Sequence, residues 1–329
     1  MKGFSNRWND FPDYILGITR EIWEDRGVAT LHDYYSSDIP VRTPMGVARG
    51  NQGVIAATMA TLHEFPDREL FGEDVIWSGD DATGYLSSHR IISTGTHRGD
   101  GWFGPATGRR FQIRVIADCA ARADTIFDEW LVCDNGGLIR QLGGNPQDFA
   151  RSLIAREGGP QKASRPLTPE LDMQGDYLGR GNDNPWGQRY AETLTRIMRG
   201  DLAHVFHGYD RAVLAEHAGG RSLLSARAVA DSWLGLRSSF PSATFAIHHV
   251  IGMDGPMMPP RAAIRWSLTG RHDGWGMFGA PTGAAVHVMG MAHAEYGPFG
   301  PEGIGLRREF ALFDEIAIWK QILLHTGDL

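Results

Sequence analysis

Two histidines and two arginines stand at matching places in the two halves of the chain. His97 and His272 each adjoin a glycine-rich segment, and Arg90 and Arg265 each lie within a strand-like run. Such a histidine could carry a proton or donate a hydrogen bond to a substrate, or it could hold the following loop by bonding to its backbone. An arginine in mid-strand is costly unless it is paired or faces water. Arg90 and Arg265 could therefore bind a substrate carboxylate, polarise a carbonyl, or pair with a glutamate.

Other common catalytic and binding motifs are missing from the sequence. The glycine-rich segments at 101–108 and 276–283 lack the Gly-Lys-Ser/Thr ending of a phosphate-binding loop. No cluster of His, Cys, Asp and Glu has the spacing of a zinc or calcium site. No Gly-x-Ser-x-Gly segment indicates a serine hydrolase. We therefore expect neither a metal nor a cofactor.

The chain carries one sequence twice. Residues 94–108 (TGTHRGDGWFGPATG) and 269–283 (TGRHDGWGMFGAPTG) are identical at nine of fifteen positions, without a gap and at an offset of 175. Beyond residue 108 the offset grows to 180, so the second copy has about five extra residues, expected in the turn at 296–301. A tandem duplication predicts two domains of the same fold.

Helices followed by strands are predicted in each copy. Apolar residues recur at helical spacing at the start of each copy, and a second helix is expected at 53–63 and 227–236. Strand-like runs follow at 73–77, 89–96, 110–117 and 125–133, and at 244–251, 262–269, 285–291 and 306–317. This order indicates an α+β fold with antiparallel neighbouring strands. We expect domains at 1–150 and 186–329, joined by a linker at 151–185 that is rich in Gly, Pro, Asn and Asp.

The composition is that of a globular protein. Of the 329 residues, 42% are hydrophobic and 22% are charged, and the net charge is -7. The acidic balance argues against a nucleic-acid partner. No apolar run approaches the roughly 18 residues of a membrane span, and no signal peptide is evident. The two cysteines, Cys119 and Cys133, fit a reducing compartment. We expect a cytoplasmic protein that contacts neither nucleic acid nor a membrane.

The first copy resembles the SnoaL-like polyketide cyclases, which belong to the nuclear transport factor 2-like superfamily. The resemblance rests on GTHRGDGWFGPATGRRF at residues 95–111 and FDEWLVCDNGGLIRQLG at residues 127–143. It implies two cone-shaped domains, each a curved antiparallel sheet wrapped around N-terminal helices and enclosing one deep pocket. Relatives dimerise through the open face of the sheet, so the resemblance implies an intrachain pseudo-dimer. Further assembly into a homo-oligomer stays open.

The resemblance also implies a reaction, an intramolecular aldol closure without metal or cofactor. In that chemistry a carboxylate moves a proton from carbon to oxygen, with a histidine on an adjacent strand. The position of the family's acid is Leu131 in the first copy and Ala311 in the second. The position of its histidine is Ala117 in the first copy and Ala292 in the second. None of these four side chains can move a proton.

A glutamate two residues before each vacant acid position could replace the missing carboxylate. Because residues two apart in a strand share a face, Glu129 should face the same way as Leu131, and Glu309 the same way as Ala311. The candidate catalytic residues are therefore Glu129, His97 and Arg90 in the first copy and Glu309, His272 and Arg265 in the second. The alternative for Glu129 is a salt bridge with an arginine such as Arg90 or Arg140.

Two functions remain open at this point. The first is a cyclase or isomerase type of enzyme, which would cyclise, isomerise, hydrate or dehydrate a small apolar carbonyl compound held in a cone pocket. The second is a non-catalytic protein that binds a small molecule or serves as a scaffold, having lost the family's acid and histidine. A glutamate inside a closed apolar cavity would favour the enzyme, and one salt-bridged on the outer face would oppose it.

Overall fold

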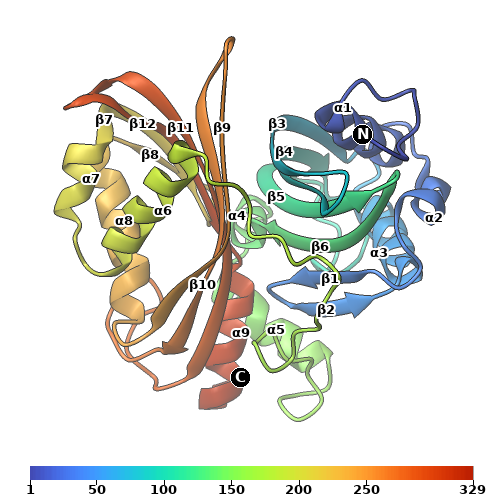
Figure 1. Ribbon diagram of the computed structural model, residues 1–329. Coiled ribbons are helices and arrows are strands. Elements are labelled where there is room, and N and C mark those ends of the chain that lie inside the picture. Colours follow the sequence, from blue (N-terminus) through green and yellow to red (C-terminus); the bar gives the residue numbers. More distant parts are fainter. Residues whose placement is uncertain (329) are drawn as a thin grey trace.

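The computed structural model describes residues 1–328 as two units of the same α+β topology (Figure 1). The first sheet consists of β1 (Pro40–Thr43), β2 (Gly46–Arg49), β3 (Glu69–Asp80), β4 (Gly84–Thr96), β5 (Arg110–Arg122) and β6 (Thr125–Cys133). The second consists of β7 (Tyr209–His217), β8 (Arg221–Leu224), β9 (Thr244–Gly255), β10 (Met258–Arg271), β11 (Ala285–Gly300) and β12 (Gly303–Phe313). Their spatial orders, β2-β1-β6-β5-β4-β3 and β8-β7-β12-β11-β10-β9, correspond strand by strand. The predicted tandem arrangement is confirmed.

Helices cover one face of each sheet. The first unit has α1 (Phe11–Trp23), α2 (Leu31–Tyr34) and α3 (Asn51–Glu64), and the second has α6 (Pro185–Met198), α7 (Ala203–Gly208) and α8 (Ala226–Ser239). The Asp10 side chain caps α1, and the Asn184 side chain caps α6, each followed by a proline in the first turn. Apolar residues at helical spacing then bury the inner faces of α1 and α6. The helices predicted at 53–63 and 227–236 are α3 and α8.

The sheets are mixed, whereas the sequence predicted purely antiparallel ones. Strand β1 runs parallel to β6, and β7 runs parallel to β12. The strands β1, β2 and β8 have only four residues each, which is too short for an alternating pattern to be recognised. The strand predicted at 306–317 ends at Phe313, because the Asp314 side chain accepts a hydrogen bond from Ile316 N and starts α9 (Glu315–Thr326).

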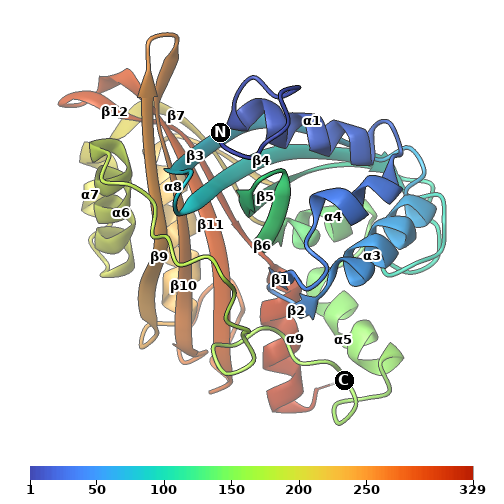
Figure 2. The ribbon, with the colours of Figure 1, turned by 45° about the vertical axis from the view of Figure 1, so that its right-hand side comes forward.

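The two sheets face each other across the middle of the molecule, with α1 to α3 and α6 to α8 on the outer sides (Figures 1 and 2). Apolar side chains from both sheets form shared clusters there, including Ile116 and Val132 from the first unit and Met291 and Leu312 from the second. Ion pairs between the units, such as Arg261 with Asp74, accompany them. The chain thus makes within itself the sheet-to-sheet contact expected of a pseudo-dimer.

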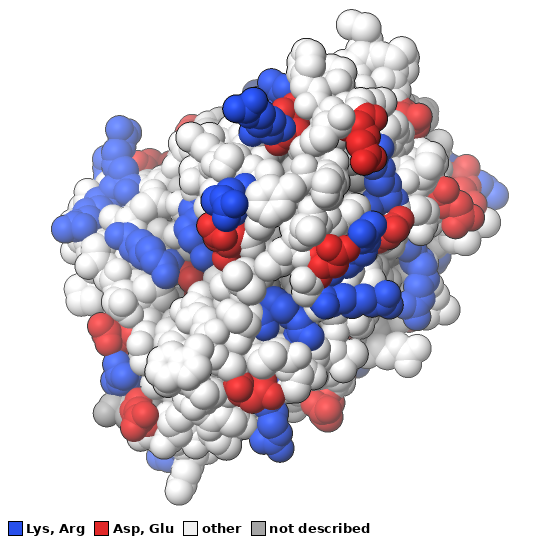
Figure 3. All heavy atoms as spheres, turned by 90° about the vertical axis from the view of Figure 1, so that its left-hand side faces the viewer, with Lys and Arg blue, Asp and Glu red and all other residues white. Residues whose placement is uncertain are grey.

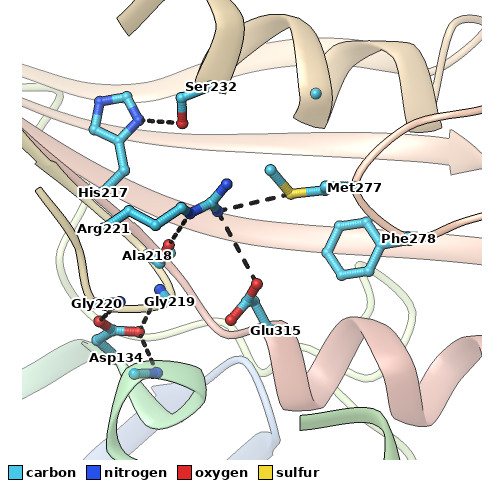
Figure 4. Close-up of polar contacts among 12 residues, drawn as sticks. Asp134, His217, Ala218, Gly219, Gly220, Arg221, Ser232, Met277, Phe278 and Glu315 are labelled. Atoms are coloured by element: carbon cyan, nitrogen blue, oxygen red, sulfur yellow. Dashed lines mark hydrogen bonds and ion pairs between the residues drawn. The ribbon is translucent and has the colours of Figure 1, made fainter. Parts of the chain in front are cut away.

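A second contact joins the ends of the sheets. After β6 the chain forms α4 (Asn135–Gln141) and α5 (Pro146–Arg156), and α5 packs against α9 of the second unit. The Asp134 carboxylate, at the start of α4, accepts hydrogen bonds from Gly219 N and Gly220 N, each at 2.7 Å (Figure 4). Arg140 of α4 pairs with Glu315 of α9. The two units are therefore connected by buried polar groups as well as by apolar ones.

The segment at 157–184 crosses from α5 to α6 without a helix or an extended strand. It packs closely on both sheets: Asp172 pairs with Arg42 of β1, and Gly181 forms a bridge with Val250 of β9. A side chain at Gly181 would overlap the Val250 backbone, and the residue has a φ of +102°, so this close approach requires glycine. Residues 164, 165 and 171 of this segment reach the first unit's cavity, described below.

Charges of both signs are interspersed on the outer face of the second unit, with broad uncharged areas between them (Figure 3). Within residues 1–328, no helix combines the length and the apolar character needed to cross a membrane.

Candidate functional site

A large cavity lies inside the first unit, between its helices and its sheet. Its volume is about 840 Å³, in the upper part of the range for small-molecule sites. Most of its wall is apolar, with side chains from α1, α3 and strands β3 to β6 such as Ile15, Ile18, Val54, Ile91 and Leu131. The few polar groups that reach it are therefore well placed to orient a ligand. Among them are Tyr35, Arg68, His89 and Glu129.

Glu129 lines the cavity from the middle of β6, as strand alternation predicted. The side chain is buried, with 6% of the residue exposed, and no ion pair to it is found within the described residues. Burial raises the pKa of the Glu129 carboxyl to about 7, against the smaller, opposing effect of a hydrogen bond from Tyr35. Its two suggested salt-bridge partners pair elsewhere, Arg140 with Glu315 and Arg90 with Glu73 and Glu295.

The vacant family positions also face this cavity, and a histidine lies beside them. Ala117 of β5 pairs with Leu131 of β6, and on its other side Ala117 pairs with His89 of β4. All three residues line the cavity. His89 thus occupies the position directly across from the missing histidine, one strand further along the sheet. Side chains in such cross-strand pairs are roughly 5 Å apart at their β-carbons.

The surroundings of His89 keep its ring neutral. The residue is 2% exposed, and its Nε2 atom is buried without a hydrogen-bond partner. The ring lies against Gly72 of β3, where any larger residue would overlap Nε2. Burial, together with the positive charge of Arg90, lowers the pKa of His89 to about 3. Sequence reasoning missed His89, because it placed the neighbouring Arg90 in the site, and strand alternation then turns His89 to the opposite face.

His97 and His272 hold the glycine-rich loops. His97 Nδ1 is 3.2 Å from Thr107 Oγ1, and its Nε2 is 3.3 Å from Glu64 Oε1, a carboxylate that accepts hydrogen bonds from the loop amides of Trp102 and Phe103. In the second unit, His272 Nδ1 is 3.0 Å from Thr282 Oγ1 in the same arrangement. Neither histidine is among the residues that line the first unit's cavity.

Arg90 and Arg265 point to the opposite face of their strands, between the two sheets. Arg90 pairs with Glu73 and Glu295, and its guanidinium lies 3.8 Å from the centre of the Phe310 ring. Arg265 pairs with Asp118 at 2.9 Å and stacks on a tryptophan ring of the first unit. The structure therefore does not bring these arginines together with Glu129 or Glu309.

Glu309 lies in the interior of the second unit, where four donors surround its carboxylate. Tyr190 Oη, Tyr209 Oη, His217 Nε2 and Trp233 Nε1 lie between 2.7 and 3.1 Å from its two oxygens. The residue is fully buried. Because the four donors occupy the hydrogen-bond acceptor positions of both oxygens, this carboxylate is fixed as part of the core.

Two tryptophans fill the second cone. Trp233 and Trp266 are at most 1% exposed, and at the repeat offset of 175 they replace Thr58 and Ile91, which both line the first unit's cavity. Gly290 makes room for the Trp266 ring, since a side chain there would overlap it. The two copies thus share a fold but differ in what occupies their interiors.

No group of three or more His, Cys, Asp and Glu side chains suited to a metal is found among residues 1–328.

A cone of helices and curved sheet around an apolar cavity defines a protein of the nuclear transport factor 2-like class. Within this class, residues 14–142 match the model of the SnoaL-like polyketide cyclase family. The first unit is therefore similar to a SnoaL-like domain, and the second unit repeats its fold in tandem. No curated protein is significantly similar to the chain.

Similar solved structures each match about 40% of the chain. IdmH from Streptomyces antibioticus is 25% identical, with 40% of this chain and 97% of that chain covered and a TM-score of 0.35. TsrD from Streptomyces laurentii is 23% identical, with 40% and 90% covered and a TM-score of 0.34. A SnoaL-like polyketide cyclase from Agrobacterium tumefaciens is 20% identical, with 40% and 97% covered and a TM-score of 0.32.

Proposed function

We propose that the first unit is a cofactor-free acid–base catalyst of the cyclase or isomerase type, acting on an apolar carbonyl compound in its cavity. The observation that carries this proposal is Glu129, a carboxyl without an ion pair in an apolar cavity, whose burial raises its pKa to about 7. At neutral pH such a group is present in both protonation states. It can therefore take a proton in one step and return it in the next.

The chemistry starts with proton abstraction. The Glu129 carboxylate takes a proton from a carbon next to the carbonyl. The electron pair of that C–H bond forms a double bond to the carbonyl carbon, and the π electrons of the carbonyl move onto its oxygen. His89, neutral because of its low pKa, donates a hydrogen bond to this oxygen as negative charge develops. Glu129 and His89 lie on strands two places apart, so their backbones are separated by roughly 10 Å and a substrate fits between them.

The second unit serves as the structural partner in this proposal. Its glutamate, Glu309, has four donors around it, and two tryptophans fill the space around it. A carboxylate held by four donors is poorly placed to take a proton from a substrate. One copy thus keeps the cavity, and the other covers its sheet.

Deuterium exchange tests the proposal without knowledge of the natural substrate. Loss of α-hydrogen signals from 2-tetralone in D₂O, followed by NMR, reports proton abstraction directly. We expect exchange by the wild type to rise with pH up to about 7, and Glu129→Gln to reduce it by roughly 100-fold or more. His89→Gln should slow exchange while leaving the pH midpoint in place, because its own pKa is about 3.

Glu309→Gln is the matched control, since it makes the same change at the corresponding position of the second copy. It should keep the exchange activity in protein that remains folded by tryptophan fluorescence. Equal exchange by wild type and Glu129→Gln would refute the proposal.

A second candidate function is ligand binding without turnover. It is favoured by Leu131 and Ala117, which leave the family's two catalytic positions empty of proton-moving groups. Tight binding of 2-tetralone with no exchange in the wild type would support this function.

A further inference from the structure

An arginine without a carboxylate partner lines the same cavity. Arg68 lies just before β3, and its Nε donates a hydrogen bond to Ser93 Oγ at 3.0 Å. Its guanidinium carbon is 5.3 Å from the centre of the Trp23 ring, another residue of the cavity wall. Within residues 1–328, no Asp or Glu carboxylate lies within ion-pairing distance of this guanidinium. Its remaining N–H groups are available to a ligand.

Other arginines in the interior of this protein are paired. Arg42 pairs with Asp128 and Asp172, Arg90 with Glu73 and Glu295, and Arg265 with Asp118. Arg68 is only partly exposed, and burial lowers its pKa, against opposing effects of Cys133 and of the Glu64 carboxylate, which lies beyond ion-pairing distance. An anion bound in the cavity would supply the direct partner that Arg68 lacks.

Arg68 and Glu129 reach the cavity at different ends. The guanidinium of Arg68 is close enough to Cys133 to oppose the effect of burial on the pKa of that thiol. Cys133 lies four residues after Glu129 in the same strand. At about 3.4 Å per residue, the two ends are roughly 13 Å apart along β6. The wall between them is apolar, with Leu131 facing the cavity.

We propose that the substrate is an elongated apolar keto acid, whose carboxylate binds Arg68 while the carbon to be deprotonated lies beside Glu129 some 13 Å away. This inference rests on the proposed function, because it takes the same cavity as the substrate site. The guanidinium would form two parallel hydrogen bonds with the carboxylate, a geometry that lysine cannot reproduce. The binding site for the anion would fix the direction in which the substrate enters.

Calorimetric titration with a matched pair of probes tests the proposal. The pair is 4′-acetylbiphenyl-4-carboxylic acid, which has its ketone and carboxylate at opposite ends, and its uncharged methyl ester. We expect wild type to bind the acid about 10- to 100-fold more tightly than the ester. Arg68→Met should remove this preference, and Arg68→Lys should retain part of it. Added salt should weaken binding of the acid more than that of the ester.

Arg165 provides the control, as an exposed arginine at the same cavity. Arg165→Met should keep the preference for the acid. Equal binding of both probes by wild type, or loss of the preference in Arg165→Met but not in Arg68→Met, would overturn the assignment. Glu129→Gln should keep the preference while losing deuterium exchange. The anion site and the catalytic role of Glu129 can therefore fail separately.

Discussion

The buried carboxyl of Glu129 should make the stability of the protein depend on pH in a defined way. Replacing Glu129 by Gln keeps the shape of the side chain and removes its ionisation. In the folded protein burial raises the pKa of Glu129 from its ordinary value of 4.5 to about 7. One pH unit corresponds to about 1.4 kcal/mol, so ionising Glu129 in the folded protein costs about 3 kcal/mol of folding free energy.

The sign of the effect follows from which state binds the proton. Below about pH 4.5 both the folded and the unfolded chain keep the proton, and ionisation costs nothing. Between pH 4.5 and about 7 the unfolded chain loses the proton while the folded protein retains it, so the free energy of unfolding falls as the pH rises. Above pH 7 the carboxylate is ionised in both states, and the full cost remains. Glu129→Gln avoids this cost at every pH.

Urea unfolding of wild type and Glu129→Gln at several pH values between 4 and 8.5 measures the effect. The variant's stability relative to wild type should increase by about 3 kcal/mol from pH 4.5 to pH 7.5. Contributions of all other titrating groups cancel in this difference. A difference that stays constant between pH 4 and 8.5 would show that Glu129 is not held in an apolar site.

Two further substitutions test the hollow first cone and the contact between the units. Thr58→Trp introduces into the first unit the tryptophan that the second unit has at position 233. In protein that stays folded, it should lower the affinity for the biphenyl ester by about 10-fold or more, measured by calorimetry. Unchanged affinity would place the ligand outside this cavity. Arg265→Met leaves Asp118 buried without its partner and should reduce the free energy of unfolding by about 3–5 kcal/mol, much of it restored by adding Asp118→Asn. If the double variant were no more stable than Arg265→Met, the pair would not be the cause of the loss.

Local patterns in the sequence were sufficient for most elements of the fold. Helix α3 was predicted as a run that ends before Phe65-Pro66, and β3 to β6 as strand-like runs, because these signals lie within each segment. The extra residues of the second copy were placed near 296–301, and the structure has there the tip of a longer hairpin, in which Gly300 pairs with Gly303. The parallel pairing of β1 with β6 was not predicted, because it joins segments about 90 residues apart and leaves no local signal.

The same distinction applies to the candidate site. Alternation along β6 was enough to turn Glu129 toward the interior, since a side chain's face depends only on its place in the strand. The roles expected for Arg90 and His97 depended on which residues of other elements lie near them. In the structure, Glu295 from the second unit pairs with Arg90, and Glu64 from α3 lies beside His97.

The sequence by itself determined that this chain is a duplicated α+β unit whose first copy matches the SnoaL model, because repeats, periodicity and turn residues are local properties of the chain. Only the tertiary structure decided which copy is hollow. That outcome depends on which side chains meet across each core. Thr58 and Ile91 line the cavity of the first unit, whereas Trp233 and Trp266 meet at the corresponding positions of the second. The tertiary structure also set the pKa of Glu129, because distant parts of the chain exclude water from its carboxyl group and so raise that pKa.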